Sequence, residues 1–366
     1  MNSFSGKLKY VIILAVIVPA LSCCRKNAPQ KQPGTTVIPS VISLNAPESN
    51  KVVTCGDPVK ISYTRKNQDV RIDSVIVFEG RNQVMARQGD PGELEWNSGR
   101  SKMGQNTLRV QFYYNDSLKE SHNVNVIVLS DIVPVNYSYS VVAKYPHDNQ
   151  AYTQGLVYDG GYLLESTGLE GKSTLRVVDI KSGKTEKLVS LAPKFFGEGI
   201  ALLNDNIYQV TYKNQVGFVY DKNTLSQIRS FDYQFREGWG LGTDGTHLIM
   251  SDGTSQLFFI EPEYFTQVDQ IRVFDNKGMI DSLNEIEYIN GKILSNIYGE
   301  SYIVIIEPTT GKVIGKVDFS KLVPEGYQNN MGYVLNGIAW NPSTGNLYIT
   351  GKNWPVLYEV KLTPSL

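Results

Sequence analysis

Histidine and cysteine are scarce in this 366-residue sequence, with three of each. The histidines are widely separated, at His122, His147 and His247. A zinc enzyme needs about three or four His, Cys, Asp or Glu ligands close together, so the sequence predicts no catalytic metal. The formal net charge is −1, from 35 basic and 36 acidic residues, and this balance does not favour nucleic acid as a partner.

Long hydrophobic runs are also absent, apart from one short apolar segment near the N-terminus. Basic residues precede this segment, 10–21, and Ser22, Cys23 and Cys24 follow it. It is shorter than the about 20 residues that span a bilayer, and its flanking residues are typical of a secretory signal. The sequence resembles a bacterial lipoprotein signal, with a signal peptide at residues 1–22 and Cys23 as the lipidated residue; Cys24 is the alternative acceptor.

This resemblance implies an exported lipoprotein that is anchored to a membrane of the bacterial envelope and faces the periplasm. Residues 23–40, which include Lys, Gln and Pro without apolar periodicity, would form a flexible tether. Cys55 is the one remaining cysteine. We therefore expect no disulfide framework, and we interpret Cys55 as an inert, buried thiol.

Residues 41–131 are expected to form an immunoglobulin-like β-sandwich. Apolar and polar residues alternate in four segments that polar turns separate. These segments are 59–63, 74–78, 107–112 and 124–128. No cluster of titratable residues occurs among them, and we interpret this domain as a spacer or docking module without chemistry of its own.

A short motif recurs five times in residues 132–366, at intervals of about 40–50 residues. The copies are Gln154-Gly155-Leu156, Glu198-Gly199-Ile200, Trp239-Gly240-Leu241, Asn284-Glu285-Ile286 and Asn336-Gly337-Ile338. Each begins an apolar run that ends in a turn signal, and two further strands follow. One four-stranded blade per repeat predicts an all-β, five-bladed β-propeller. The last repeat lacks a fourth strand, and we expect the segment 137–142 to close the ring.

Polar and aromatic residues at these motifs would gather at one end of the propeller channel, where loops from different blades converge. They are Gln154, Glu198, Glu237, Trp239, Asn284, Glu285, Glu287 and Asn336. Each residue alone could instead cap a strand end or tie neighbouring blades by hydrogen bonds. Their joint occurrence on one ring favours a ligand site.

Longer motifs around these positions occur in order along the chain. They are Tyr145-Pro146-His147-Asp148, Tyr152-Thr153-Gln154-Gly155-Leu156, Phe196-Gly197-Glu198-Gly199, Glu237-Gly238-Trp239-Gly240-Leu241, Leu283-Asn284-Glu285-Ile286-Glu287-Tyr288, Leu335-Asn336-Gly337-Ile338-Ala339 and Thr350-Gly351-Lys352-Asn353-Trp354-Pro355. With them the sequence resembles the plant-type glutaminyl cyclases, also called glutamine cyclotransferases, over residues 145–362. The resemblance implies a five-bladed propeller that converts the N-terminal glutaminyl residue of a peptide into pyroglutamate with release of ammonia. It leaves residues 1–130 unexplained.

The resemblance also implies three catalytic residues. Glu198 would carry a proton from the attacking α-amine to the leaving amide nitrogen, for which a raised pKa is suited. If its carboxylate accepted backbone N–H groups instead, its pKa would be lowered. Lys352 and Asn284 would donate hydrogen bonds to the oxyanion, each worth about 3 kcal/mol. The alternatives are an ion pair of Lys352 with Glu237 or Glu287, and a strand cap at Asn284.

Five further residues are expected to bind the substrate. Gln154 would contact the amine or amide of the substrate, or its side chain would instead form a hydrogen bond with a neighbouring blade. Trp239 retains one tryptophan of the family's pocket wall, whereas Tyr212 and Tyr298 stand where the family has tryptophan. Tyrosine keeps an apolar wall and adds a hydroxyl. Phe196 completes the set, with inter-blade packing as its alternative role.

No catalytic cofactor is expected, but the resemblance suggests a structural calcium in the propeller channel, which would need about six to eight oxygen ligands. Two other functions stay open at this point. One is a non-catalytic propeller that binds peptides or glycans at the cell envelope, which the two tyrosines mildly favour. The other is calcium-dependent hydrolysis, against which the scarcity of histidine argues.

Overall fold

The computed structural model describes residues 39–366, except residues 117 and 329. All regular structure in this part is β-strand apart from two 3₁₀ turns, η1 (Ser98–Arg100) and η2 (Ser320–Leu322), so the all-β prediction is confirmed. Among these residues, no helix has the length and hydrophobicity to cross a membrane. The predicted signal peptide, Cys23 and nearly all of the predicted tether lie outside the described residues.

Two sheets share one core in the first part of the described chain. One has the order β1-β3-β6, with β1 (Ile42–Ala46), β3 (Pro58–Arg65) and β6 (Glu93–Asn97). The other has the order β2-β8-β7-β4-β5, with β2 (Lys51–Thr54), β8 (Leu118–Leu129), β7 (Gly104–Tyr114), β4 (Ile72–Glu79) and β5 (Asn82–Gln88). Ile61 and Trp96 from the first sheet and Phe112 and Val126 from the second lie in one buried cluster. All four predicted strands are confirmed, and Cys55 is a free, buried thiol as expected.

Three four-stranded antiparallel sheets follow, each in sequence order. The first contains β10 (Thr153–Asp159), β11 (Tyr162–Thr167), β12 (Thr174–Asp179) and β13 (Thr185–Ser190); the second contains β14 (Gly197–Leu203), β15 (Asn206–Thr211), β16 (Val216–Asp221) and β17 (Gln227–Asp232); the third contains β18 (Leu241–Thr243), β19 (Leu248–Ser251), β20 (Gln256–Glu261) and β21 (Thr266–Arg272). Their middle strands are buried along most of their length, because each sheet packs between two neighbours.

The remaining strands form one eight-stranded sheet, in the order β22-β23-β24-β25-β9-β28-β27-β26. Its strands are β9 (Val135–Pro146), β22 (Leu283–Ile289), β23 (Lys292–Ile297), β24 (Tyr302–Ile306), β25 (Val313–Asp318), β26 (Leu335–Asn341), β27 (Asn346–Gly351) and β28 (Val356–Thr363). β9 runs parallel to β25 over Val135–Tyr137 and antiparallel to β28 from Ser138 to Pro146. The sheet therefore divides into a fourth group, β22–β25, and a fifth, β26–β28 with β9. As predicted, the segment 137–142 supplies the strand that the last repeat lacks.

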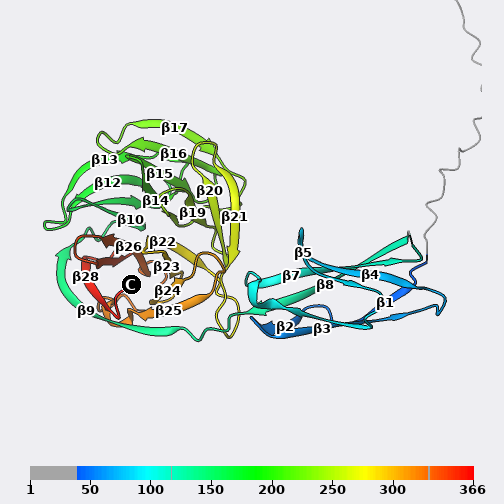
Figure 1. Cartoon of the computed structure of the whole chain (residues 1–366). Helices are drawn as coiled ribbons and strands as arrows, with labels where there is room; N and C mark the ends of the chain where they lie inside the picture. Colours follow the sequence, from blue (N-terminus) through cyan, green and yellow to red (C-terminus); the bar gives the residue numbers. More distant parts are fainter. Residues whose placement is uncertain (1–38, 117, 329) are drawn as a thin grey trace, which may run out of the picture. The chain divides into compact units, whose positions relative to one another are not determined.

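The first strands of the five groups contact one another in a closed circuit, β10–β14–β18–β22–β26–β10. Buried apolar clusters fill the spaces between neighbouring groups, and one of them joins the first group to the fifth through Leu156, Leu163 and Leu357. Burying each such side chain contributes about 1.5–3 kcal/mol. Figure 1 shows the groups around a common centre, a β-propeller-like arrangement that gathers the starts of the first strands.

Candidate active site

A pocket of about 220 Å³ opens at one end of this ring. In an antiparallel pair, the start of one strand lies beside the end of the next, so residues at these places share one rim. Its lining comprises Tyr152, Gln154, Phe196, Glu198, Tyr212, Trp239, Asn284, Tyr298 and Lys352. The structure thus brings together all eight residues that the sequence predicted as catalytic or substrate-binding.

The repeat explains why these residues converge. Gln154, Glu198 and Asn284 are the second residues of β10, β14 and β22. Tyr212, Tyr298 and Lys352 directly follow the ends of β15, β23 and β27. Equivalent positions in successive repeats therefore point to the same place from different sheets.

Five aromatic rings form the pocket wall in an unbroken series. The centroid distances are 6.2 Å for Tyr152–Phe196, 5.7 Å for Phe196–Tyr212, 6.4 Å for Tyr212–Trp239 and 5.5 Å for Trp239–Tyr298. Three of these pairs meet edge to face, a favoured geometry for aromatic side chains. The wall is therefore both apolar and mutually supported.

Lys352 connects the two ends of this aromatic series. Its Nζ lies 4.8 Å from the ring centroid of Tyr152 and 5.0 Å from that of Tyr298, within range for cation–π attraction. Burial lowers the pKa of Lys352 to about 8, although the charge of Glu198 opposes this shift. Glu237 instead pairs with Lys213 at 3.6 Å. Across the described residues Lys352 makes no salt bridge, so the alternative ion pairs are not observed.

Glu198 is the one carboxyl group in the pocket lining, and it is only 5% exposed. Burial raises its pKa well above the usual range; the charge of Lys352 works against this rise and that of Glu237 adds to it. No backbone N–H in the described part of the chain donates to this carboxylate. The alternative in which such hydrogen bonds lower the pKa of Glu198 is therefore not observed. A carboxyl group with a raised pKa is better suited to proton transfer in both directions than one with the usual pKa.

Two amides complete the polar part of the pocket. Asn284 is 1% exposed, and its Oδ1 has no hydrogen-bond partner in the described structure. An unpaired buried acceptor costs about 1–3 kcal/mol, which a donor on a bound ligand would offset. The side chain of Asn284 is therefore not a strand cap. Gln154 lines the pocket and also accepts a hydrogen bond from Asn336 Nδ2 at 3.5 Å. The bond to a neighbouring strand group is therefore present, and contact with a substrate stays a prediction.

Two glycines leave space for the aromatic wall. At Gly168 an added Cβ would lie 2.3 Å from Phe196 Cε1 and 2.9 Å from Gln154 Nε2. At Gly253, where φ is +80°, it would lie 2.5 Å from the indole of Trp239, and this backbone conformation itself favours glycine. A side chain at either place would displace a residue of the pocket wall.

Comparison with known proteins identifies the family. The family model for glutamine cyclotransferase matches residues 117–362, well over half of the sequence. The chain belongs to the glutamine cyclotransferase family. A glutaminyl-peptide cyclotransferase of Arabidopsis thaliana is 41% identical over 251 residues, which cover 67% of this chain and 74% of that protein. The crystal structure of Myxococcus xanthus glutaminyl cyclase aligns with a TM-score of 0.59 and 35% identity, over 63% of this chain and 98% of that one.

Four polar residues of the repeated motifs do not line the pocket of this glutamine cyclotransferase family member. Glu285 and Glu287 accept hydrogen bonds from backbone N–H groups of other strand groups. Asn336 donates to the carbonyl of residue 153. Glu237 accepts a hydrogen bond of 3.0 Å from Trp239 Nε1 and so orients the indole. For Glu285, Glu287 and Asn336, the predicted alternative of hydrogen bonds between neighbouring strand groups describes what the side chains do, whereas Glu237 orients a residue of the pocket wall.

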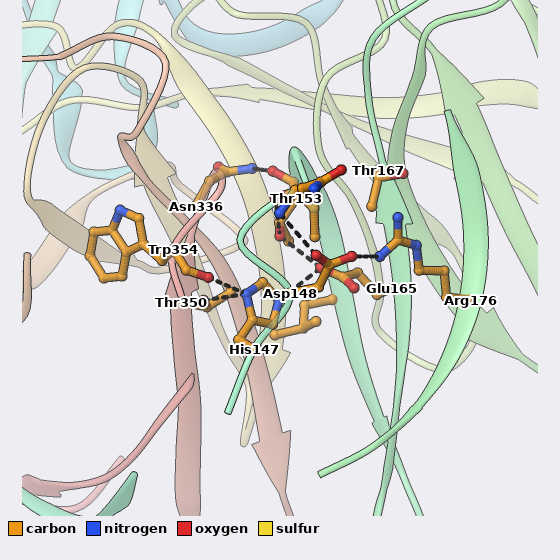
Figure 2. Close-up of polar contacts among 12 residues, drawn as sticks. His147, Asp148, Thr153, Glu165, Thr167, Arg176, Asn336, Thr350 and Trp354 are labelled. Carbon is orange, nitrogen blue, oxygen red and sulfur yellow. Dashed lines mark hydrogen bonds and ion pairs between the residues drawn. The ribbon is translucent and has the colours of Figure 1, made fainter. Parts of the chain in front are cut away.

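A buried polar network stands beside the pocket and joins the fifth group to the first. His147 Nδ1 lies 2.7 Å from the carbonyl oxygen of Trp354, and its Nε2 lies 3.0 Å from Glu165 Oε1 (Figure 2). The hydroxyl of Thr153 donates to the same carboxylate oxygen at 2.7 Å. Burial would lower the pKa of His147, but the charge and hydrogen bond of Glu165 raise it above its usual range. The network fixes the segments that carry Gln154 and Lys352.

Tyr152 is the pocket residue that the sequence prediction missed. The only signal was its place in the motif, two residues before Gln154. Trp354, by contrast, is fully buried and donates its indole N–H to the carbonyl oxygen of Tyr333 at 2.7 Å, so it belongs to the core of the cyclotransferase fold. In the described residues, no three or more His, Cys, Asp or Glu side chains come together in a way that could hold a metal ion.

Proposed function

We propose that this protein is a glutaminyl-peptide cyclotransferase, which converts the N-terminal glutaminyl residue of a peptide into pyroglutamate and releases ammonia. The observation that carries the proposal is the meeting of a buried Glu198 and a buried Lys352 in one aromatic-walled pocket. Membership of the glutamine cyclotransferase family and the named Arabidopsis relative support it.

Glu198 shuttles one proton in this mechanism. The neutral α-amine attacks the δ-carbon of its own side-chain amide, which forms the C–N bond of the five-membered ring. The Glu198 carboxylate accepts the proton that the amine loses and returns it to the amide nitrogen, whose C–N bond then breaks to release ammonia. Because burial raises its pKa, Glu198 can act as base and then as acid.

Lys352 and Asn284 stabilise the oxyanion that the attack creates on the amide oxygen. The ammonium of Lys352 has no counter-ion in a salt bridge within the described chain, and it is held in place by the rings of Tyr152 and Tyr298. The Oδ1 of Asn284 lacks a hydrogen-bond partner in the part of the chain that the structure describes, whereas the donor to the oxyanion in this mechanism is the Nδ2 of the same amide. Donors that are fixed before the reaction act without reorganisation, and each is worth about 2.7–4 kcal/mol.

The aromatic wall binds the aliphatic part of the glutamine side chain. Phe196, Tyr212, Trp239 and Tyr298 supply apolar surface, and Gln154 offers its amide to the amine or amide of the substrate. The two tyrosines keep this surface continuous. Peptides with N-terminal glutamine are therefore the substrates.

The proposal extends to the domains. Residues 132–366 form a five-bladed β-propeller, which is supported by the five groups of four strands and the closed circuit of their first strands. Residues 41–131 form an immunoglobulin-like sandwich that acts as a spacer, in agreement with two sheets around one core. Residues 1–22 are a lipoprotein signal, Cys23 carries the lipid and residues 23–40 are the tether. The protein is thus anchored to a membrane in the bacterial envelope, facing the periplasm.

A structural calcium in the channel stays a prediction from the family resemblance. The described side chains offer two neighbouring carboxyl groups there, Glu285 and Glu287, and both accept backbone hydrogen bonds. They do not form a group of three acidic or imidazole ligands, so this donor set does not fit a calcium site built from side chains. No step of the mechanism involves it.

Ammonia release from a glutaminyl dipeptide tests the proposed function. The purified protein and its Glu198→Gln variant are assayed with EDTA present, since the variant keeps the size of the side chain but cannot exchange the proton. We expect chelator-resistant turnover that drops by about 10²–10⁴ in the variant. No turnover by the wild-type protein would overturn the proposal and favour a non-catalytic propeller that binds peptides or glycans.

A further inference from the structure

A groove lies next to the pocket, over the fourth group of strands. Tyr298 lines the pocket, and the next residue, Gly299, lines a groove of about 560 Å³. The opposite wall belongs to the long connection between β25 and β26, which contributes Tyr327, Met331 and Tyr333. Both walls leave the strands at the edge that carries the pocket, because they follow the ends of β23 and β25.

The far wall of the groove is fixed to the segment that carries Lys352. The backbone N–H of Lys352 donates to the carbonyl oxygen of Val334 at 2.9 Å. Asn353 Nδ2 donates to the carbonyl oxygen of Gly332 at 3.0 Å, and the indole of Trp354 bonds to Tyr333. The groove and the pocket are therefore parts of one connected rim.

The groove is open, and its lining combines apolar side chains such as Met331 with polar ones such as Glu300 and Gln328. Met331 is 51% exposed, and the space above Gly299 is bounded by its methyl group, which would lie 3.2 Å from a Cβ at that position. Tyr327 and Tyr333 pack against each other with ring centroids 4.5 Å apart. An exposed methionine beside aromatic rings offers an adaptable contact for apolar side chains.

A peptide substrate extends beyond the pocket. The pocket, of about 220 Å³, is smaller than the about 300–1,000 Å³ of sites that enclose a drug-sized ligand, so it takes one residue. Cyclisation uses the α-amine and the side chain of that residue, whereas its carbonyl carbon leads to the rest of the peptide. The following residues must leave the pocket across its rim.

We propose that the groove binds the second and third residues of the peptide substrate and selects apolar or aromatic side chains there, through Met331 and Tyr327. This inference rests on the proposed cyclotransferase function. Burial of one apolar side chain in the groove should raise kcat/KM by about tenfold over a substrate that lacks it.

The test compares glutamine amide with the tripeptide amide Gln-Phe-Phe in the wild-type protein and in Met331→Ala. We expect the wild type to prefer the tripeptide by about tenfold. Met331→Ala should lose most of this preference through a higher KM, with turnover of glutamine amide unchanged. Met279→Ala is the matched control, because Met279 is 55% exposed and lines neither the pocket nor the groove.

Each outcome decides one question. An unchanged preference in Met331→Ala, or an equal loss on both substrates, would overturn the groove as a binding site. If Met331→Ala unfolds, Tyr327→Ala provides the same comparison. If the wild type turns over glutamine amide but does not prefer the tripeptide, the proposed role of the groove is wrong and the cyclotransferase function stands. If the wild type turns over neither substrate, the proposed cyclotransferase function is itself wrong.

Discussion

The lowered pKa of Lys352 predicts that kcat depends on pH between pH 7 and pH 9, which a lysine with the usual pKa would not cause. With a pKa of about 8, Lys352 is charged in about nine-tenths of the molecules at pH 7 and in about one-tenth at pH 9. A lysine with the usual pKa of about 10.4 stays almost fully charged over this range. If the ammonium stabilises the oxyanion, its contribution to kcat falls about tenfold between these pH values.

Lys352→Arg supplies the reference, because a guanidinium keeps its charge at every pH in this range. Ammonia release is measured for both proteins from pH 7 to pH 9 with saturating glutaminyl dipeptide. The α-amine of the substrate, with a pKa of about 7.7–8.0, also titrates here, but it does so with both enzymes. The ratio of wild-type to variant kcat therefore isolates Lys352, and we expect this ratio to fall about tenfold.

A second variant measures how much the charge contributes. Lys352→Met removes the charge and keeps most of the length, so kcat should fall by about 10²–10³ at pH 7. Circular dichroism of each variant checks that the fold persists. A ratio of wild type to Lys352→Arg that stays constant up to pH 9 would refute the reasoning, since either the charge would be irrelevant or the pKa would not be lowered.

Two further predictions concern Glu287 and Tyr152. Burial raises the pKa of Glu287 from 4.5 to about 8, so the folded protein holds a proton that the unfolded chain releases, and stability should fall as pH rises from 5 to 8. In urea unfolding, the free energy of unfolding of Glu287→Gln should gain about 3 kcal/mol relative to that of the wild type between pH 5 and pH 8. The same difference in free energy between the two proteins at both pH values would contradict this. Tyr152→Ala should lower kcat/KM about tenfold, because Lys352 and Phe196 lose a neighbouring ring, whereas Tyr152→Phe should stay within about twofold of wild type. Similar losses in both variants would assign the effect to the hydroxyl.

Much of the site could be predicted because the repeat itself encodes position. Residues at the second place of each first strand, such as Gln154 and Glu198, necessarily share one edge of the ring once the strands are antiparallel. Strand ends such as Lys352 reach the same edge. Neither inference needs knowledge of how the sheets pack, and position in the repeat alone pointed to Gln154, Glu198, Trp239 and Asn284, together with residues that do not line the pocket. The other predicted pocket residues, Phe196, Tyr212, Tyr298 and Lys352, were implied by the resemblance to the glutaminyl cyclases.

The sequence could not tell which motif residues face the pocket and which tie the sheets together. Asn284 and Glu285 are adjacent, yet the amide lines the pocket while the carboxylate accepts N–H groups of other strand groups. Successive residues on a strand point to opposite faces, and small irregularities at the strand start decide which face a side chain takes. The pairing register of β22 and β23 shifts between Leu283 and Ile286.

The packing of Phe274 against the two N-terminal sheets could not be predicted from the sequence, for a different reason. Phe274 lies in the connection after β21, yet it is buried in the same apolar cluster as Trp96 and Phe112 of the two N-terminal sheets. Nothing in the local pattern around Phe274 distinguishes it from a residue packed within the ring. Likewise, the length of the β25–β26 connection was visible, but the wall that Met331 forms beside the pocket was not.

The pairing of β9 with β28 governs the order in which this chain can fold. Ser138 donates its hydroxyl to the carbonyl oxygen of Thr363, 225 residues further on. During synthesis, the first three sheets can form from neighbouring hairpins, but the last group cannot be completed until Thr363 has emerged. Closing so long a loop is slow and costs entropy, and until then β9 presents an unpaired edge that could pair with another chain. Completion of the ring is thus a late step, which follows the synthesis of β28.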